Sequence, residues 1–263
     1  MKEMTLQEIQ DLQLEMMQKV HEFCVSHNIR YSLGGGTLLG AIRHKGYIPW
    51  DDDIDIMMPR PDYERFIREF KGVDSDLTIQ NYYTDISFHR EWTRINNDRT
   101  LLVYALAVGG VYVEIFPIDG LPDEEKTREY LSYIKSLRTK LWRTVKKKRE
   151  AVRGNFYISR LKYYLRQLVF PSRKTIIGEY EKLFDSYPFD TAKYAGAIIG
   201  VYGMKEHMDA DVFKKYILVP FEKYQFYAIA DYDAYLKKHY GDYMKLPPKE
   251  QQKSEHNFKV YWK

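Results

Sequence analysis

The stretch YSLGGGTLLGAIRHKGYIPWDDDIDIMMP, residues 31–59, decides the fold that this sequence predicts. Residues 31–33 are typical of the end of a short strand, Gly34–Gly36 permit a tight backbone turn, and Thr37 is placed to cap a helix that ends at Arg43. Backbone N–H groups at such a turn point outward with a partial positive charge, the arrangement that holds phosphate oxygens. The sequence therefore predicts an anion-binding site formed by Gly35, Gly36 and Thr37.

The acidic cluster that follows continues into an alternating pattern. In residues 53–58, DIDIMM, the acids alternate with apolar residues, which is the two-residue period of a strand with one buried face. Asp53 and Asp55 therefore project to the same side. Carboxylates placed so closely repel each other unless a cation lies between them, and a hard, oxygen-binding ion such as Mg²⁺ suits them. We expect one or two Mg²⁺ ions here, with Asp51 and Asp52 either supporting the site or forming a polar turn.

A further acid stands in the apolar run VYVEIF, residues 111–116. An unpaired carboxylate in a buried strand would cost several kcal/mol, so Glu114 needs a partner. If this strand lies beside residues 53–58, Glu114 joins the two aspartates as a third carboxylate. Asp119, in the Gly-containing segment that follows, is expected either to form a turn or to take part in catalysis.

The order of strand, Gly-Gly-Thr turn, helix and acid-alternating strand resembles the signature of the nucleotidyltransferase superfamily. More narrowly, GGTLLGAIRHKGYIPWDDDIDIMMPRPDY, residues 35–63, resembles the central motif of the LicD family, the phosphocholine transferases related to fukutin-type phosphosugar transferases. The segment YGDYMKLPP, residues 240–248, resembles the C-terminal motif of that family. The resemblance covers about residues 25–120 and 200–256.

This resemblance implies an α+β fold in which a nucleotidyltransferase-like mixed β-sheet core is flanked by helices. It implies one domain over residues 1–263, with a basic helical hairpin inserted at about residues 123–190. The implied reaction is a Mg²⁺-dependent transfer of phosphocholine, or a related phospho-alcohol, from a CDP-alcohol such as CDP-choline. The implied acceptor is a hydroxyl of a cell-surface glycan such as teichoic acid or lipopolysaccharide, and CMP is released.

The superfamily pattern also assigns roles to particular residues. Asp53, Asp55 and Glu114 are the implied catalytic and metal-binding acids, although aspartate is more usual in the family at the position of Glu114. Glu114 is then expected either to complete the metal shell or to take the proton from the acceptor hydroxyl. Three basic residues are expected either to neutralise phosphate or to form structural ion pairs: Arg43, His44 and Arg94.

Choline recognition calls for aromatic faces around a quaternary ammonium. Trp50 is the first candidate because it directly precedes the acidic cluster, and Tyr47 and Tyr243 are expected behind it. Each of these three residues has the alternative role of an ordinary core side chain.

Two other functions are compatible with the same residues. One is a nucleotidyltransferase that moves a nucleoside monophosphate to a sugar or small-molecule hydroxyl, which would release pyrophosphate rather than CMP. The other is a non-catalytic glycan or membrane adaptor. The complete set of three acids argues against an adaptor, because buried carboxylates that repel each other are costly to keep without a catalytic role.

Charge is unevenly distributed along the 263 residues. Residues 138–174 contain thirteen Lys or Arg and one acid, a charge of +12, which leaves −8 on the rest of a chain whose total is +4. This basic hairpin is expected either to be a solvated face or to dock on anionic lipid. Nucleic acid is not expected as a partner, because no nucleic-acid-binding motif accompanies the charge.

The sequence also predicts a compartment. Cys24 is expected to be a buried small hydrophobe, and a single cysteine cannot form an internal disulfide. The N-terminal segment lacks the apolar core of a signal peptide, and no segment approaches eighteen consecutive apolar residues. We expect a cytoplasmic protein, either free or peripheral at the inner face of the membrane.

Periodicity predicts the remaining elements. Residues 5–27 form the clearest helix, with a capping box from Thr5 to Glu8 and a left-handed exit at Asn28. Pro59 and Pro61 are expected to bracket a turn. Other predicted helices cover 62–70, 123–148, 157–170, 173–187 and 231–240; predicted strands cover 77–82, 92–95 and 111–116; the apolar runs 194–202 and 216–221 are either strands or packed loops.

Overall fold

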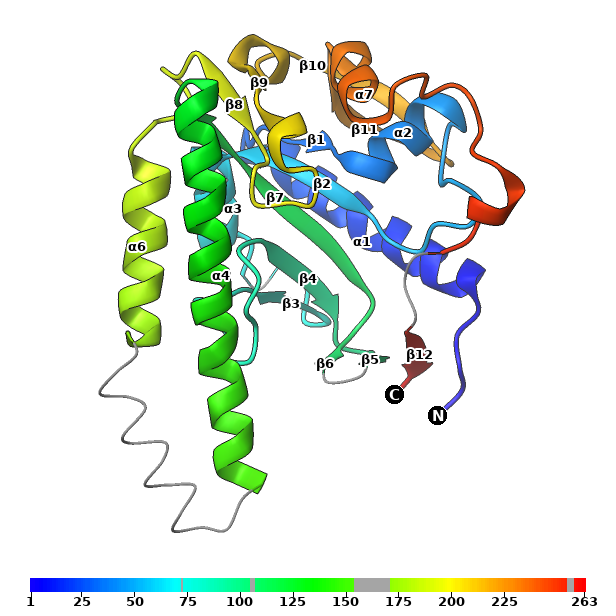
Figure 1. Ribbon diagram of the computed structural model, residues 1–263. Helices are drawn as coiled ribbons and strands as arrows, with labels where there is room; N and C mark the ends of the chain where they lie inside the picture. Colours follow the sequence, from blue (N-terminus) through cyan, green and yellow to red (C-terminus); the bar gives the residue numbers. More distant parts are fainter. Residues whose placement is uncertain (72, 105–106, 154–170, 255–257) are drawn as a thin grey trace.

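The structure, a computed structural model, describes residues 1–71, 73–104, 107–153, 171–254 and 258–263. A mixed sheet lies at its centre (Figure 1), with the strand order β1-β2-β7-β4-β3 and with β8 and β9 attached to the far end of β7. β2 and β7 are parallel, and the other pairs in this sheet are antiparallel. The strands are β1 (Ser32–Leu33), β2 (Asp55–Pro59), β3 (Leu77–Gln80), β4 (Thr93–Asn97), β7 (Tyr112–Leu121), β8 (Tyr194–Gly196) and β9 (Met208–Asp209).

Helices flank this sheet, as the sequence predicts. In Figure 1, α1 lies behind the sheet, α4 and α6 run side by side along one edge, and α2 and α7 lie together near β10 and β11. The helices are α1 (Leu6–Ser26), α2 (Gly35–Arg43), α3 (Arg60–Glu69), α4 (Glu124–Arg153), α6 (Arg173–Asp185) and α7 (Tyr232–Tyr240), with short 3-10 turns at Gly203–Glu206, Ala210–Phe213 and Lys249–Gln251. The predicted helix over residues 157–170 lies outside the described residues.

Helix α1 has the ends that the sequence predicts. The Thr5 side chain accepts a hydrogen bond from the backbone of Glu8, and Glu8 accepts one in return from the backbone of Thr5, so the capping box is complete. Asn28 follows the helix with a φ of 51°. Cys24 is 1% exposed, and burial raises the pKa of its thiol, which confirms it as a buried small hydrophobe.

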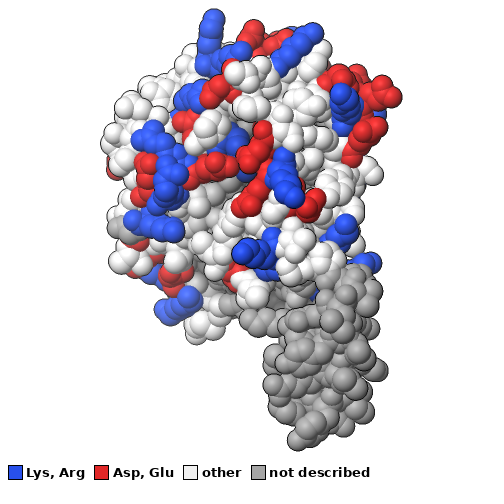
Figure 2. All heavy atoms as spheres, turned by 90° about the vertical axis from the view of Figure 1, so that its left-hand side faces the viewer, with Lys and Arg blue, Asp and Glu red and all other residues white. Residues whose placement is uncertain are grey.

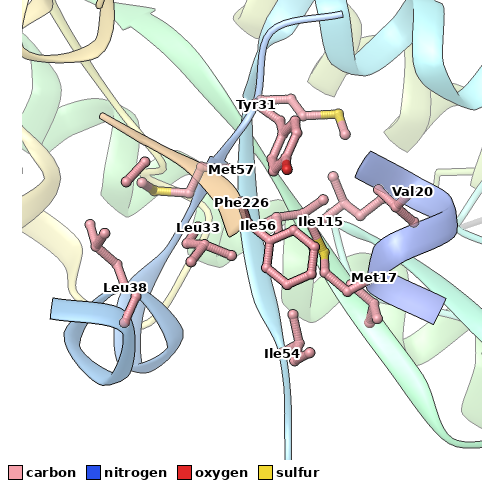
Figure 3. Packing of buried hydrophobic residues seen from close by; sticks show 14 of the residues in the cluster. Met17, Val20, Tyr31, Leu33, Leu38, Ile54, Ile56, Met57, Ile115 and Phe226 are labelled. Atoms are coloured by element: carbon pink, nitrogen blue, oxygen red, sulfur yellow. The ribbon is translucent and has the colours of Figure 1, made fainter. Parts of the chain in front are cut away.

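The core lies between α1 and the sheet. Figure 3 shows Ile115 of β7 beside Met17 and Val20 of α1, with Met57 of β2 on the other side of the strand. Because successive strand residues point to opposite faces, Ile54 and its even-numbered neighbours pack on α1 while the odd-numbered residues face away. The acids of this segment therefore lie on the face that the helix does not cover.

Helix α2 begins three residues earlier than the sequence predicts. Gly34 is its N-cap, and the helix begins at Gly35, which has a φ of 45°. The Thr37 hydroxyl does not cap the helix; it accepts a hydrogen bond from the backbone N–H of Asp55 at 2.8 Å. The predicted cap was wrong because Thr37 is buried against the start of β2, where an N–H group needed a partner.

Two expectations for the segments beside the sheet were also wrong. No separate turn lies between Pro59 and Pro61, because Pro59 ends β2 and directly precedes α3. β7 continues five residues beyond the predicted strand, so Asp119 lies in a strand and forms no turn. Its buried carboxylate binds Arg60 through two hydrogen bonds of 2.6 and 2.8 Å, which ties β7 to α3.

Several short strands have no clear signal in the sequence. β5 (Thr100–Tyr104), β6 (Ala107–Gly109) and β12 (Lys259–Trp262) form a separate sheet. β11 (Tyr224–Ile229) was not predicted either, whereas its partner β10 (Tyr216–Phe221) is the apolar run 216–221, for which the strand alternative is confirmed. β12 also joins the two ends of the chain: the backbone N–H of Met4 donates to Val260, and that of Trp262 donates to Lys2. The pairing of residues so far apart in sequence is not visible in local periodicity.

The face that carries α6 shows a mixture of charges. In Figure 2, acidic and basic side chains alternate over its described part, and much of the predicted basic hairpin falls on residues whose side chains are not described. Two of the described cations serve the fold instead: Arg138 binds Glu91, and Arg173 donates to three backbone carbonyls of residues 82–88. None of the described helices is long and apolar enough to cross a bilayer.

Candidate active site

A cavity of about 340 Å³ opens on the face of the sheet that α1 does not cover. Its floor is formed by β2 and β7, one side by the glycine turn before α2, and the other by the loop after β8 together with α7. Its volume is that of a pocket for a small organic ligand. Six of the ten predicted site residues line this cavity: Gly35, Gly36, Trp50, Asp53, Asp55 and Glu114. The other four, Thr37, Arg43, His44 and Arg94, lie outside its lining.

The three predicted acids meet in this cavity. Asp55 and Glu114 are register partners in the parallel pair of β2 and β7, so their side chains leave the sheet on the same face. Asp53 lies two residues before Asp55, and all three line the cavity. The expected adjacency of the two acidic strands is confirmed.

Asp55 is the most constrained of the three. Its Oδ1 is buried and has no hydrogen-bond partner among the described residues. Burial raises the pKa of this carboxyl well above its usual value, and the charges of Asp53 and Glu114 raise it further. A divalent cation would give Oδ1 a partner and offset the repulsion, so the residues present fit such an ion.

A second acidic group lies next to these three. One carboxylate oxygen from each of Asp51, Asp52 and Asp53 lies within 4.8 Å of the other two, which is close enough to share a metal ion. The Asp52 carboxylate accepts a hydrogen bond of 2.6 Å from Ser254, so the C-terminal segment supports this group. Asp53 belongs to both groups, so a metal ion held by both would lie between residues 51–53 and the start of β2.

Helix α1 holds the acidic loop, residues 51–53, through side-chain hydrogen bonds. The Gln10 side-chain amide donates to the backbone carbonyl of Asp51 at 2.7 Å, and that of Gln13 donates to the carbonyl of Asp52 at 2.9 Å. Gln13 also donates to the carbonyl of Tyr112 in β7 at 3.2 Å. These two buried glutamines hold the loop and the strand in one arrangement. Nothing in the sequence indicates this role beyond their place on the buried side of α1.

The glycine turn brings the backbone of α2 against the acids. A β-carbon at Gly35 would lie 3.4 Å from Oδ2 of Asp55, and one at Gly36 would lie 3.1 Å from Oδ2 of Asp51. The N–H of Gly34 donates to the carbonyl of Asp55 at 2.8 Å. Glycine is needed at position 35 both for this close approach and for its positive φ. The first N–H groups of α2 therefore lie beside the carboxylates.

Arg94 is the predicted cation that the structure places beside the acids. Its Nε donates to Glu114 at 2.6 Å, and its guanidinium lies 4.0 Å from the centre of the Tyr112 ring. Burial lowers the pKa of Arg94, but the carboxylate of Glu114 outweighs that effect and raises it. Arg94 thus compensates the charge of Glu114, as the ion-pair alternative expects.

Arg43 and His44 lie away from the cavity wall. Nη1 of Arg43 donates to the backbone carbonyl of Tyr243 at 2.9 Å, and its Nε donates to Nε2 of His44 at the same distance. Burial and the charge of Arg43 lower the pKa of His44, which favours a neutral imidazole at neutral pH. The contact of Arg43 and His44 with phosphate stays a prediction.

Aromatic residues form most of the remaining wall. Trp50, the first candidate for choline, lines the cavity. Tyr47 and Tyr243 are buried, and their hydroxyls bind the carbonyl of Gln10 and the carboxylate of Asp233. Five aromatic residues that sequence reasoning missed line the cavity instead: Trp92, Phe116, Tyr202, Tyr235 and Tyr240. They come from four separate segments, so no local pattern identifies them together.

The tyrosines share a hydrogen-bond network. The hydroxyls of Tyr202 and Tyr240 contact each other directly. Burial raises the pKa of both phenols, and the charge of Asp55 raises them further, so both stay protonated at neutral pH. Next to Tyr202, Nε2 of His239 lies 3.1 Å from Oε1 of Glu206. This distance is short enough for an ion pair, but the two atoms are not aligned as a hydrogen bond.

Comparison with known proteins gives consistent similarities. The family model described as LicD/FKTN/FKRP, nucleotidyltransferase domain, matches residues 28–171. The chain is 35% identical over 272 residues to the lipopolysaccharide cholinephosphotransferase LicD of Haemophilus influenzae, covering 99% of each chain. Over 72 residues, 26% of the chain, it is 48% identical to an uncharacterized protein of Rickettsia prowazekii, and the match covers 27% of that protein. Over 72 residues, also 26% of the chain, it is 39% identical to an uncharacterized protein of Rickettsia typhi, and the match covers 23% of that protein.

Proposed function

The chain belongs to the LicD/FKTN/FKRP family of nucleotidyltransferase domains, and from this premise we propose that it transfers phosphocholine from CDP-choline to a glycan hydroxyl. The proposed acceptor is a lipopolysaccharide-type glycan, because the full-length relative is a lipopolysaccharide cholinephosphotransferase. Teichoic acid is the acceptor to compare with it. The observation that carries the proposal is the cavity in which Asp53, Asp55 and Glu114 face the N-terminus of α2 across from aromatic rings.

The proposed reaction is one displacement at phosphorus. The acceptor oxygen bonds to the phosphorus that carries choline, the bond from that phosphorus to the CMP oxygen breaks, and CMP leaves. Glu114, which Arg94 holds in place, either receives the hydroxyl proton or completes the metal shell. The amides of Gly35, Gly36 and Thr37 offer hydrogen bonds to the diphosphate.

The proposed cofactor is Mg²⁺, as one ion or two. Asp53 and Asp55 would hold it, with support from Asp51 and Asp52. When bound, the ion neutralises the charge that develops on the diphosphate oxygens. The role of the protein residues is to fix this charge pattern: α1 holds the acidic loop, and Thr37 holds the backbone of Asp55.

The aromatic wall supports choline as the transferred alcohol. A quaternary ammonium binds to aromatic faces and to nearby negative charge without needing hydrogen-bond donors. The cavity offers both, since Trp50, Trp92 and Tyr202 line it together with Glu206. We expect the choline end of the donor to lie among these residues while the diphosphate end lies at the glycine turn.

Product analysis tests this proposal. The protein is incubated with CDP-choline, Mg²⁺ and a lipopolysaccharide that lacks phosphocholine, and CMP is followed by chromatography while choline is measured in the glycan. Equal amounts of CMP and glycan-bound choline are expected, and EDTA should abolish both. Parallel reactions with CDP-ethanolamine and CDP-ribitol measure the preference for the quaternary ammonium.

Other outcomes would contradict the proposal in distinguishable ways. CMP without choline in the glycan would indicate a hydrolase. Pyrophosphate released from a nucleoside triphosphate, with the nucleoside monophosphate found on the acceptor, would indicate the nucleotidyltransferase alternative. Absence of binding to both nucleotide and Mg²⁺ in calorimetry would indicate the non-catalytic adaptor.

A further inference from the structure

The cavity contains a pair of tyrosine hydroxyls whose hydrogen bonds are only partly used. Tyr202 comes from the loop after β8 and Tyr240 from the last turn of α7, and their hydroxyl oxygens are in hydrogen-bond contact. Each hydroxyl has one proton, so one donates to the other and the acceptor keeps a proton that this contact does not use. Among the residues that the structure describes, neither hydroxyl has a further hydrogen-bond partner. Since both residues line the cavity, the spare proton is available to a molecule bound in it.

This pair is held by a buried network rather than by chance packing. Glu206 accepts from the backbone N–H of Ala197 at 3.2 Å and from the hydroxyl of Tyr235 at 3.5 Å, so it joins both ends of the loop to α7. The side chain of His239 is fully buried. Its ring stacks on that of Tyr235 with 4.0 Å between the ring centres and packs edge-on to that of Tyr202 with 4.8 Å between the centres. These contacts leave Tyr202 little freedom to turn away from the cavity.

The Tyr202 hydroxyl lies beside the glycine turn. A β-carbon at Gly35 would lie 3.8 Å from this hydroxyl oxygen and 3.4 Å from Oδ2 of Asp55. The Tyr202 hydroxyl and the Asp55 carboxylate therefore both lie within 4 Å of the same point beside Gly35. A ligand oxygen that binds the first amides of α2 would lie within reach of the Tyr202 hydroxyl. Oδ1 of Asp55, which has no hydrogen-bond partner among the described residues, lies in the same part of the cavity.

We propose that the Tyr202 hydroxyl, oriented by Tyr240, donates a hydrogen bond to a non-bridging oxygen of the diphosphate that binds the first amides of α2. This rests on the proposed function, since it concerns the same substrate at the same site. Tyr202 is then a substrate-binding residue, and Tyr240 is a positioning residue that acts through it. A hydrogen bond from a neutral hydroxyl to a charged phosphate oxygen accounts for a change of about 10- to 100-fold in binding when it is removed.

Binding of inorganic pyrophosphate tests the proposal without relying on turnover. Isothermal titration with pyrophosphate and Mg²⁺ compares the wild type with Tyr202→Phe, Tyr240→Phe and the control Tyr133→Phe. Tyr133 lies on the outer surface of α4, where its hydroxyl binds Glu179 at 2.9 Å, so its loss is expected to change nothing at the cavity. We expect about 10- to 100-fold weaker binding for Tyr202→Phe and a smaller loss, about 3- to 10-fold, for Tyr240→Phe.

Three results would overturn the proposal. These are wild-type-like affinity in Tyr202→Phe, a larger loss in Tyr240→Phe than in Tyr202→Phe, and no binding of pyrophosphate to the wild type. Circular dichroism and thermal melting confirm that each variant is folded. Turnover of CDP-choline is measured separately: a wild type that binds pyrophosphate but releases no CMP would contradict the proposed function while leaving the role of Tyr202 intact.

Discussion

At the scale of one residue, Asp55 combines a role in the proposed metal site with a cost in the free energy of folding. Its Oδ1 is buried without a partner among the described residues, and neighbouring carboxylates add repulsion. Such a group lowers the stability of the metal-free protein, and a cation that binds to the folded state alone raises it by mass action.

We therefore predict opposite effects of Asp55→Asn on stability and on activity. Without metal, the variant should be more stable than the wild type by about 1 to 3 kcal/mol, because the buried charge is removed. Mg²⁺ should raise the melting temperature of the wild type and leave that of the variant unchanged, and turnover should fall below detection. Thermal melting in EDTA and in Mg²⁺ measures the first two effects; equal stabilisation of both proteins by Mg²⁺ would remove Asp55 from the metal site.

The sequence was enough to predict the three acids of the site, but it did not identify the two tyrosines. Asp53, Asp55 and Glu114 lie in patterns with a two-residue period, which fixes the face of the strand that each occupies. Tyr202 and Tyr240 meet through the docking of a loop on α7, and nothing in either local sequence specifies that contact. Thr37 illustrates a further limit: a helix cap and a buried backbone N–H compete for one hydroxyl, and only the tertiary structure decides which receives it.

At the scale of elements, α1 is the part of the fold that its own sequence determines most completely. Its cap, apolar face and left-handed exit are all local signals, and all three are confirmed. Hydrogen bonds from Lys2 and the Thr5 backbone lower the pKa of Glu8 to about 2. Because the folded-state pKa lies below the unfolded value, Glu8 stabilises the protein above about pH 4.5 and loses this effect as the pH falls toward 2.

The expected consequence is a pH-dependent difference between the wild type and Glu8→Gln. Glutamine retains the capping hydrogen bonds without the charge. The wild type should melt at a higher temperature above pH 5, and the difference should shrink as the pH approaches 2. Glu15→Gln, at an exposed position of the same helix, is the control for a general effect of charge. A difference that grows on acidification would contradict the assignment.

Helix α4 contributes to the cavity through one arginine. Arg138 donates to the fully buried carboxylate of Glu91 at 2.8 Å and to the backbone carbonyl of Ile199 at 2.7 Å. Glu91 precedes Trp92, and Ile199 precedes the residues of the loop that carries Tyr202. The helical insertion therefore fixes two walls of the cavity, a role that its basic composition did not indicate.

Arg138→Met should consequently be costly. Among the described residues, it leaves Glu91 with only the hydroxyl of Tyr180 as a side-chain partner, and an uncompensated buried carboxylate costs about 3 kcal/mol. Arg128→Met on the same helix removes an exposed ion pair with Glu124 and should cost less than about 0.5 kcal/mol. Urea unfolding measures both, and the Michaelis constant for CDP-choline should rise in the first variant alone. Equal stability of the two variants would show that Arg138 does not support the cavity.

At the scale of the whole molecule, sequence reasoning gave the class of fold but not its complete sheet. The central strands β2, β4 and β7 were expected, whereas β12 pairs with β5, a segment far from it in the sequence, and no local pattern identifies that partner. Charge is the other whole-molecule property, with +12 on residues 138–174 and −8 on the remainder. A segment with such an excess of positive charge is expected to be attracted to a negative surface.

We predict flotation with vesicles that contain anionic lipid and no flotation with purely zwitterionic vesicles. Binding should fall at 0.5 M salt, because screening shortens the range of the interaction to about 4 Å or less. Replacing Lys146, Lys147 and Lys148 with glutamine should weaken it, whereas the same change at Lys214, Lys215 and Lys223, outside the basic segment, should not. Equal flotation with both kinds of vesicle would exclude electrostatic docking.

The pairing of the two chain ends through β12 offers an optical test of folding. The backbone of Lys2 binds that of Trp262, so fluorophores attached at positions 2 and 263 would lie close enough for efficient energy transfer only while the ends are joined. Cysteines introduced at these positions would react selectively, because Cys24, the sole native thiol, is 1% exposed and its raised pKa suppresses the reactive thiolate. Loss of transfer during denaturation would then report the separation of the N-terminal segment from β12, independently of what happens at the cavity.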